Sequence, residues 1–136
     1  MGENTERGPL TETVFYILLS LLEPMHGYGI MQNVKNLSGD RVNLGAGTLY
    51  GAINTLLEKQ WISAIEGEKD SRKKEYKITE IGIHVIEGEI ERLEELIMNG
   101  RKLVGGVRWS ISFGRHFMIL KKKKNWVHLF EKELKI

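Results

Sequence analysis

The chain contains no cysteine and only two prolines among its 136 residues. The absence of cysteine excludes disulfides, thiolate catalysis and cysteine-based zinc sites, so we expect a cytoplasmic protein. No apolar run approaches the roughly 18 residues that a membrane-spanning helix requires. The N-terminal residues also lack the basic-then-apolar pattern of a secretion signal, and we expect no membrane span.

Motifs of catalysis are also missing from the sequence. It contains no nucleophile elbow, no cluster of metal-ligating side chains and no phosphate-binding glycine loop. The glycines that begin at Gly45 follow the spacing Gly-x-Gly-x-x-x-Gly, which misses the dinucleotide pattern by one residue. His26 has no second ligand at a suitable spacing, so we interpret it as a packed or capping residue. We expect no enzymatic activity, no metal and no cofactor.

Charge is distributed unevenly along the chain. Residues 1–106 hold 12 basic and 16 acidic side chains, whereas residues 107–136 hold eight basic and two acidic ones. The excess of positive charge therefore lies in the last segment. Any surface of the acidic body that binds nucleic acid must be a local patch.

Residues 44–57 carry the most unusual pattern in the chain. Leu49, Ile53 and Leu56 recur at helical spacing and predict one apolar stripe. The opposite face holds glycine and short polar side chains: Gly47, Thr48, Tyr50, Gly51, Asn54 and Thr55. Glycine costs a helix about 1 kcal/mol relative to alanine, but it allows close approach to phosphates and base edges. The pattern favours a DNA recognition helix; the alternative is a buried helix weakened by glycine.

The flanking segments predict a winged helix over residues 10–78. After a loose arm at residues 1–9, two helices are expected, one capped by Thr11 and ended by Pro24, the other ending near Leu37. Two short strands follow the recognition helix and enclose a charged tip. The tip supplies four cations that we expect to contact phosphate, the alternative being a solvated hairpin: Lys69, Arg72, Lys73 and Lys74.

A long helix is predicted over residues 79–104, with Thr79 as its N-cap. Apolar residues recur at spacings of three and four: Ile83, Ile86, Ile90, Leu93 and Ile97. The same spacing continues to Gly100 and Val104. This narrow seam between charged flanks, which include Glu89, predicts a coiled-coil-like homodimer. The alternative is packing on the helix's own domain only. Gly82 and Gly88 should weaken the helix.

Gly105-Gly106 predicts the end of this helix. The remaining segment, residues 105–136, is basic and aromatic, and we assign it no role. It has the composition of a DNA- or membrane-contacting segment, of a poorly ordered extension, or of sequence appended to a complete domain.

Four motifs together resemble the PadR family of bacterial transcriptional regulators: HGYGI at 26–30, GAGTLYGA at 45–52, DSRKKEY at 70–76 and YKI before Thr79. The resemblance covers residues 10–104. It implies a winged-helix DNA-binding domain, a homodimer through the C-terminal helix, and repression of nearby genes. Family members respond to phenolic acids, drug-like aromatic compounds or other cues. The drug-binding branch carries a tryptophan on the dimer helix, but residues 96–99 contain no aromatic, so the effector stays unknown.

The sequence thus predicts a mainly α (α+β) winged helix-turn-helix protein with a long C-terminal coiled-coil-like dimerisation helix. Its expected function is dimeric, sequence-specific binding of double-stranded DNA, with repression of transcription. The alternative is a winged helix used for protein–protein interaction without DNA. Salt separates the two, because phosphate binding weakens steeply as salt rises.

Overall fold

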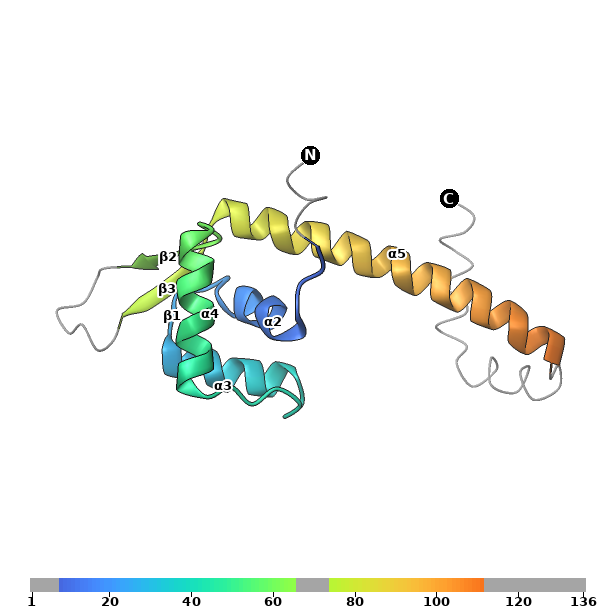
Figure 1. Ribbon diagram of the computed structural model, residues 1–136, viewed down its shortest axis with the longest axis horizontal. Helices are drawn as coiled ribbons and strands as arrows, with labels where there is room; N and C mark the ends of the chain where they lie inside the picture. The colour runs from blue at the N-terminus through green and yellow to red at the C-terminus, as the bar shows by residue number, and fades with distance from the viewer. Residues whose placement is uncertain (1–7, 66–73, 112–136) are drawn as a thin grey trace. The chain divides into compact units, whose positions relative to one another are not determined.

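The computed structural model describes residues 8–65 and 74–111. These residues divide into two units, one ending at Arg92 and the other beginning at Leu93. The elements in chain order are α2 (Glu12–Ser20), β1 (Met25–His26), α3 (Gly27–Leu37), α4 (Ala46–Glu58), β2 (Ile62–Ile65), β3 (Glu75–Ile78) and α5 (Glu80–Ile111) (Figure 1). This mainly helical fold with a small antiparallel sheet confirms the predicted winged helix.

Side-chain caps fix where three of the helices begin. The Thr11 hydroxyl accepts a hydrogen bond from the Val14 amide at 3.1 Å, at the start of α2. The Thr79 hydroxyl accepts one from the Gly82 amide at 3.2 Å, at the start of α5. The Nδ1 atom of His26 accepts one from the Gly29 amide at 3.1 Å, at the start of α3. Capping by Thr11, Thr79 and His26 is therefore confirmed.

The sheet has the strand order β1-β3-β2, and all pairs are antiparallel. The predicted hairpin is present, with Ile62 opposite Ile78 and Ile65 opposite Glu75. Strand β1 was not predicted, because two residues are too few to show an alternating pattern. Met25 pairs with Tyr76, so β1 extends the sheet on the far side of β3.

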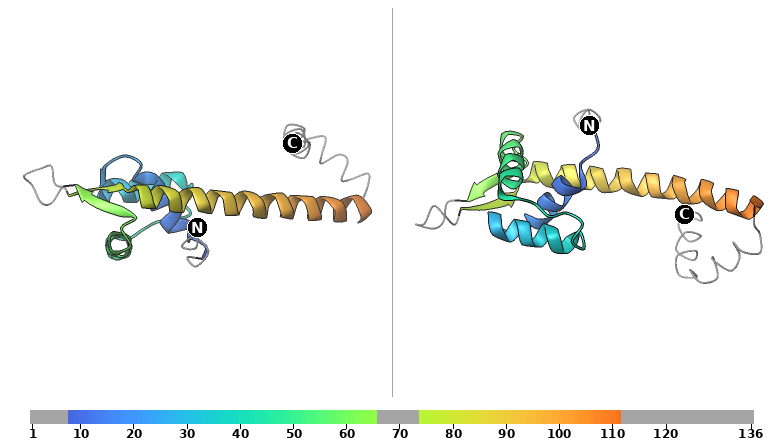
Figure 2. Two further views of the ribbon diagram at one scale, coloured as in Figure 1. Left: turned by 90° about the horizontal axis from the view of Figure 1, so that it is seen from above. Right: turned by 60° about the horizontal axis from the view of Figure 1, so that its bottom comes forward.

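One hydrophobic core joins the helices to the sheet. Figure 2 shows α2, α3 and α4 gathered around a common centre, with β2 and β3 leaving it as a narrow hairpin. The amide of Ile78 donates to the carbonyl of Leu21 at 2.8 Å and ties β3 to the end of α2. The buried apolar residues are Ile17, Leu18, Leu21, Ile30, Val34, Leu49, Ile53, Leu56, Ile62, Tyr76, Ile78, Val85 and Ile86.

Helix α5 differs from its sequence-based prediction at its end. It continues through Gly105 and Gly106 to Ile111, so the expected break at these glycines is wrong. Each glycine destabilises the helix by about 1 kcal/mol relative to alanine. This cost does not by itself end a helix of this length.

Glu89 on α5 is buried, with 2% of its surface exposed, although its position suggested a solvated flank. Its carboxylate accepts a hydrogen bond from the Leu10 amide at 3.1 Å. It also accepts two from Arg92, at 3.0 Å from Nε and 2.6 Å from Nη2. These hydrogen bonds raise the pKa of the Arg92 guanidinium. The charge of Glu89 is thus buried with partners, and it holds the chain before α2 against α5.

Gly82 is required by packing, where the sequence suggested only a weakened helix. An ideal Cβ at this position would lie 2.2 Å from the Trp61 carbonyl oxygen and 2.6 Å from Cγ1 of Ile78. The first turn of α5 therefore packs directly against the main chain at Trp61, which cannot rotate away as a flexible side chain could.

We expect Gly82→Ala to lower the free energy of unfolding by about 1–3 kcal/mol, because the added methyl overpacks this contact. The matched control in the same helix is Gly100→Ala, where the Cβ would meet no described atom within 4 Å. That variant should gain up to about 1 kcal/mol from helix propensity. Chemical denaturation measures both, and equal stability of the two variants would contradict the packing role of Gly82.

Candidate nucleic-acid interface

Helix α4 presents one buried face and one exposed face. Leu49, Ile53 and Leu56 are at most 2% exposed and enter the core. The residues that the sequence placed on the outer face are all exposed in the structure: Gly47, Thr48, Tyr50, Gly51, Asn54 and Thr55. The helix is thus amphipathic in the predicted sense, and the alternative of a fully buried helix is wrong.

The two glycines of this exposed face have no packing role among the described residues. An ideal Cβ at Gly47 or Gly51 would find no neighbouring atom within 4 Å. Each glycine nevertheless costs the helix about 1 kcal/mol relative to alanine. A cost without a packing benefit among the described residues favours a benefit from outside the chain, which is close approach of the helix backbone to a partner.

Tyr50 has an additional contact that the sequence did not reveal. A Cβ at Gly27 would lie 2.3 Å from the Tyr50 hydroxyl oxygen, so this ring packs against the backbone at the start of α3. Tyr50 also lies near Tyr76, whose pKa is raised first by burial and then by Tyr50. Tyr50 therefore helps to fix α4 against α3 while 45% of its surface remains exposed.

The exposed polar side chains of α4 differ in their hydrogen bonds. The Thr55 hydroxyl donates to the Gly51 carbonyl at 3.2 Å, which occupies its only proton. Thr48 lies in the first turn, and Asn54 lies six residues further along the helix and is also exposed. Asn54 offers both a donor and an acceptor, which is the pattern that reads adenine in the major groove.

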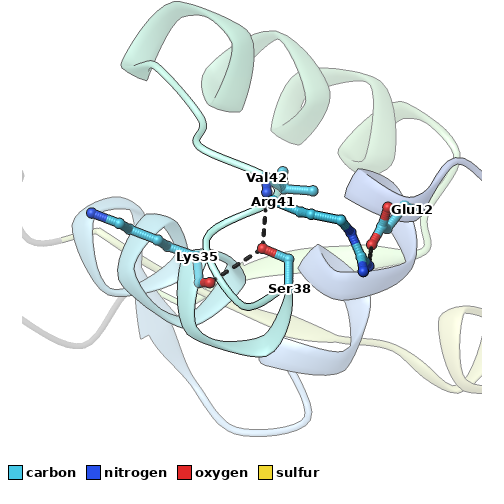
Figure 3. A network of polar contacts seen from close by, with 5 residues as sticks. All are labelled: Glu12, Lys35, Ser38, Arg41 and Val42. Carbon is cyan, nitrogen blue, oxygen red and sulfur yellow. Dashed lines mark hydrogen bonds and ion pairs between the residues drawn. The ribbon is translucent and has the colours of Figure 1, made fainter.

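The connection from α3 to α4 is ordered by side-chain hydrogen bonds (Figure 3). The buried Ser38 hydroxyl donates to the Lys35 carbonyl at 3.2 Å and accepts from the Val42 amide at 2.9 Å. Arg41 forms an ion pair with Glu12 at the start of α2, which raises the pKa of the guanidinium. These contacts set the path by which the chain enters α4.

Helix α4 itself contains no lysine or arginine between residues 46 and 58. Any neutralisation of phosphate would therefore have to come from other elements. Lys74, just before β3, and Lys77 on β3 are exposed, and Lys59 lies over the Trp61 ring at 4.8 Å. The predicted contacts at Lys69, Arg72 and Lys73 lie outside the described residues.

The predicted dimer seam is only partly available on α5. Ile86 is 5% exposed and belongs to the core of its own domain, so it leaves the seam. Leu93 is half-buried. The remaining members are exposed: Ile83 at 38%, Ile90 at 39%, Ile97 at 50% and Val104 at 55%. Leu96, Leu103 and Val107 are exposed on α5 as well.

Other site types receive no support from the residues in the described ranges. No group of three or more His, Cys, Asp or Glu side chains there is arranged to hold a metal ion. No helix in those ranges combines the length and the apolar character needed to span a membrane.

A core of three helices, an exposed amphipathic third helix and a β-hairpin define a winged-helix protein of the DNA-binding class. The sequence matches the transcriptional regulator PadR-like family over residues 16–88, more than half of the chain. The chain therefore belongs to the PadR-like family of transcriptional regulators. This confirms the resemblance seen in its motifs.

Two solved structures have the same fold. A transcriptional regulator from Clostridium thermocellum is 25% identical, with a TM-score of 0.57 over 68% of this chain and 89% of that one. A PadR family transcriptional regulator from Eggerthella lenta is also 25% identical, with a TM-score of 0.52 over 67% and 79%.

A sequence relative comes from a mobile element. The chain is 32% identical over 90 residues to an uncharacterized 37.1 kDa protein in transposon TN4556 of Streptomyces fradiae. The match covers 66% of this chain and 24% of that protein, so this chain spans about a quarter of that relative's length.

Proposed function

We propose that the protein is a homodimeric, sequence-specific repressor in which α4 enters the major groove and the wing contacts the phosphate backbone. The observation that carries this proposal is the exposed face of α4, where Gly47 and Gly51 have no partner atoms in the described chain. A helix that must sit deep in a groove benefits from such positions.

The side chains of α4 divide into two roles in this proposal. Thr48 and Asn54 contact base edges or nearby phosphates, because both are exposed on the glycine-containing face. Tyr50 positions the helix and reaches phosphate only from the edge of the face, since its ring packs on Gly27. Thr55 presents its methyl group, because its proton is used within the helix.

The proposed dimer forms through the exposed apolar residues of α5. Ile90, Ile97 and Val104 keep 39%, 50% and 55% of their surface exposed in the described chain, and apolar area left in water favours association. A two-fold dimer would present two recognition helices to a palindromic operator. A dimer bound to that operator would repress by blocking access of the transcription machinery to the DNA.

Selection of bound duplexes from a random DNA pool with purified protein tests the proposal. We expect enrichment of one two-fold symmetric site, with affinity that falls steeply as salt rises. Failure to enrich any sequence would overturn the proposal and favour the alternative, a winged helix that binds only protein. That alternative predicts partner binding with little salt dependence.

The wing makes a separate prediction. Replacing Lys73 and Lys74 with alanine should weaken binding to specific and random duplexes alike and flatten the plot of log affinity against log salt by about 1.8. The control is Lys102→Ala on α5, which removes an exposed cation outside the proposed DNA surface. An unchanged slope in the double variant would show that the wing is only a solvated hairpin.

A further inference from the structure

The end of α4 and the start of α5 meet at a joint built from Gln60, Trp61, Thr79 and Gly82. The carbonyls of the consecutive residues Gln60 and Trp61 both accept hydrogen bonds from Thr79. The Thr79 hydroxyl donates to the Gln60 carbonyl at 2.6 Å, and the Thr79 amide donates to the Trp61 carbonyl at 2.9 Å. These bonds join residues 18 or 19 positions apart in the chain.

On the α4 side, the joint is the C-terminal cap of the recognition helix. The Gln60 amide donates to the Leu57 carbonyl and the Trp61 amide to the Leu56 carbonyl, each at 3.0 Å. This pair of bonds forms a Schellman motif. Its left-handed position is usually glycine, yet Gln60 occupies it with a φ of 63°. The conformation is costly for glutamine, so the surrounding contacts must hold it in place.

On the α5 side, the joint leaves no room for adjustment. The Thr79 hydroxyl also accepts the Gly82 amide at 3.2 Å, so one oxygen both caps α5 and bonds to the end of α4. Gly82 lies so close to the Trp61 carbonyl that a Cβ would be 2.2 Å from it. The recognition helix and the first turn of α5 are therefore held at one relative angle.

We propose that Thr79 is a positioning residue for operator recognition, which sets the half-site spacing that the protein accepts. This rests on the proposed function, in which the seam residues of α5 hold the dimer. The angle between α4 and the part of α5 that carries Ile83 and Ile90 fixes where each recognition helix points. A loosened joint lets α4 rotate, so the dimer reaches half-sites at neighbouring spacings.

Substitutions at Thr79 separate this role from ordinary helix capping. Serine keeps the hydroxyl and both of its hydrogen bonds. Aspartate still accepts the Gly82 amide as an N-cap, but an ionised carboxylate cannot donate to the Gln60 carbonyl. Valine has the shape of threonine but lacks the hydroxyl, so it forms neither of these two hydroxyl bonds. The matched control is Thr11→Val, which removes the cap of α2 without touching the joint.

The experiment measures binding to the selected operator and to duplexes whose half-sites are one base pair closer or further apart. Adding or removing one base pair shifts one half-site relative to the other by about 3.4 Å and rotates it by about 35°. The wild-type protein should therefore bind its own spacing with at least about tenfold higher affinity. Serine at Thr79 and the Thr11→Val control should keep this preference. Aspartate and valine should reduce it to less than about threefold, mostly by improving binding to the altered spacings relative to the selected one.

The outcomes distinguish this inference from the proposed function. A wild-type protein that binds no duplex overturns both. A wild-type protein that prefers one spacing, with Thr79→Asp and Thr79→Val keeping the same preference, overturns the positioning role and leaves DNA binding intact. Thermal unfolding of each variant, compared with Thr11→Val, confirms that a changed preference does not come from lost stability alone.

Discussion

Replacing Gly51 with glutamate should abolish specific DNA binding while the protein stays folded. The new side chain would extend from the exposed face of α4, where a Cβ meets no described atom within 4 Å. In the proposed complex the same space belongs to the DNA groove, so the side chain would push the helix out and repel the phosphates. Operator affinity should fall by at least about a hundredfold, as for the loss of two or more base contacts.

Stability measurements and two further variants make this test decisive. Glutamate is the better helix former, so the free energy of unfolding should hold or rise by about 0.5 kcal/mol. Gly51→Gln adds nearly the same bulk without charge and should bind more tightly than Gly51→Glu but more weakly than wild type. Gly51→Ala should be the most stable and lose the least affinity. Normal operator binding by Gly51→Glu would place the recognition face elsewhere.

Local signals in the sequence were sufficient to predict most elements of the fold. Thr11 and Thr79 each precede an apolar helical pattern, and both cap the helix that follows. The outer face of α4 was predictable because it depends only on helical periodicity, with Leu49 and Ile53 fixing the inner side. These features are set within a few residues of chain.

Features that depend on a distant partner were not predictable in this way. Gly82 is needed because the Trp61 carbonyl lies against it, and Glu89 is buried because the Leu10 amide and Arg92 satisfy it. Ile86 fits the seam spacing perfectly, yet the same spacing also faces the core at the start of α5. Periodicity identifies an apolar face but does not say which surface covers it.

The Tyr50 contact illustrates the same limit within the candidate site. Its position on the outer face followed from helical spacing, and its exposure agrees with that. Its packing on Gly27 depends on how α3 crosses α4, which a single sequence does not encode in any short motif. The first glycine in HGYGI, Gly27, is explained by this contact, since a larger residue there would displace the ring.

Introducing charge into the exposed seam of α5 should separate the proposed dimer. Ile90 and Ile97 are 39% and 50% exposed in the single chain, so glutamate at both positions should leave the fold intact. In a dimer the two carboxylates would be buried against an apolar partner, which costs several kcal/mol. We expect the double variant to be monomeric at micromolar concentration in sedimentation velocity. It should also lose operator affinity, because the two-fold symmetric dimer no longer forms.

Met98→Glu provides a matched control for this prediction. Met98 is 42% exposed and follows Ile97 directly in the chain. Consecutive helical residues point about 100° apart, so Met98 points away from the seam that contains Ile97. Met98→Glu adds one negative charge, half that of the double variant, to the same helix but away from the seam, so it should leave the dimer intact. Dissociation by Met98→Glu as well would mean that the interface surrounds more of α5 than the seam. A wild-type protein that is itself monomeric at micromolar concentration would contradict the proposed dimer.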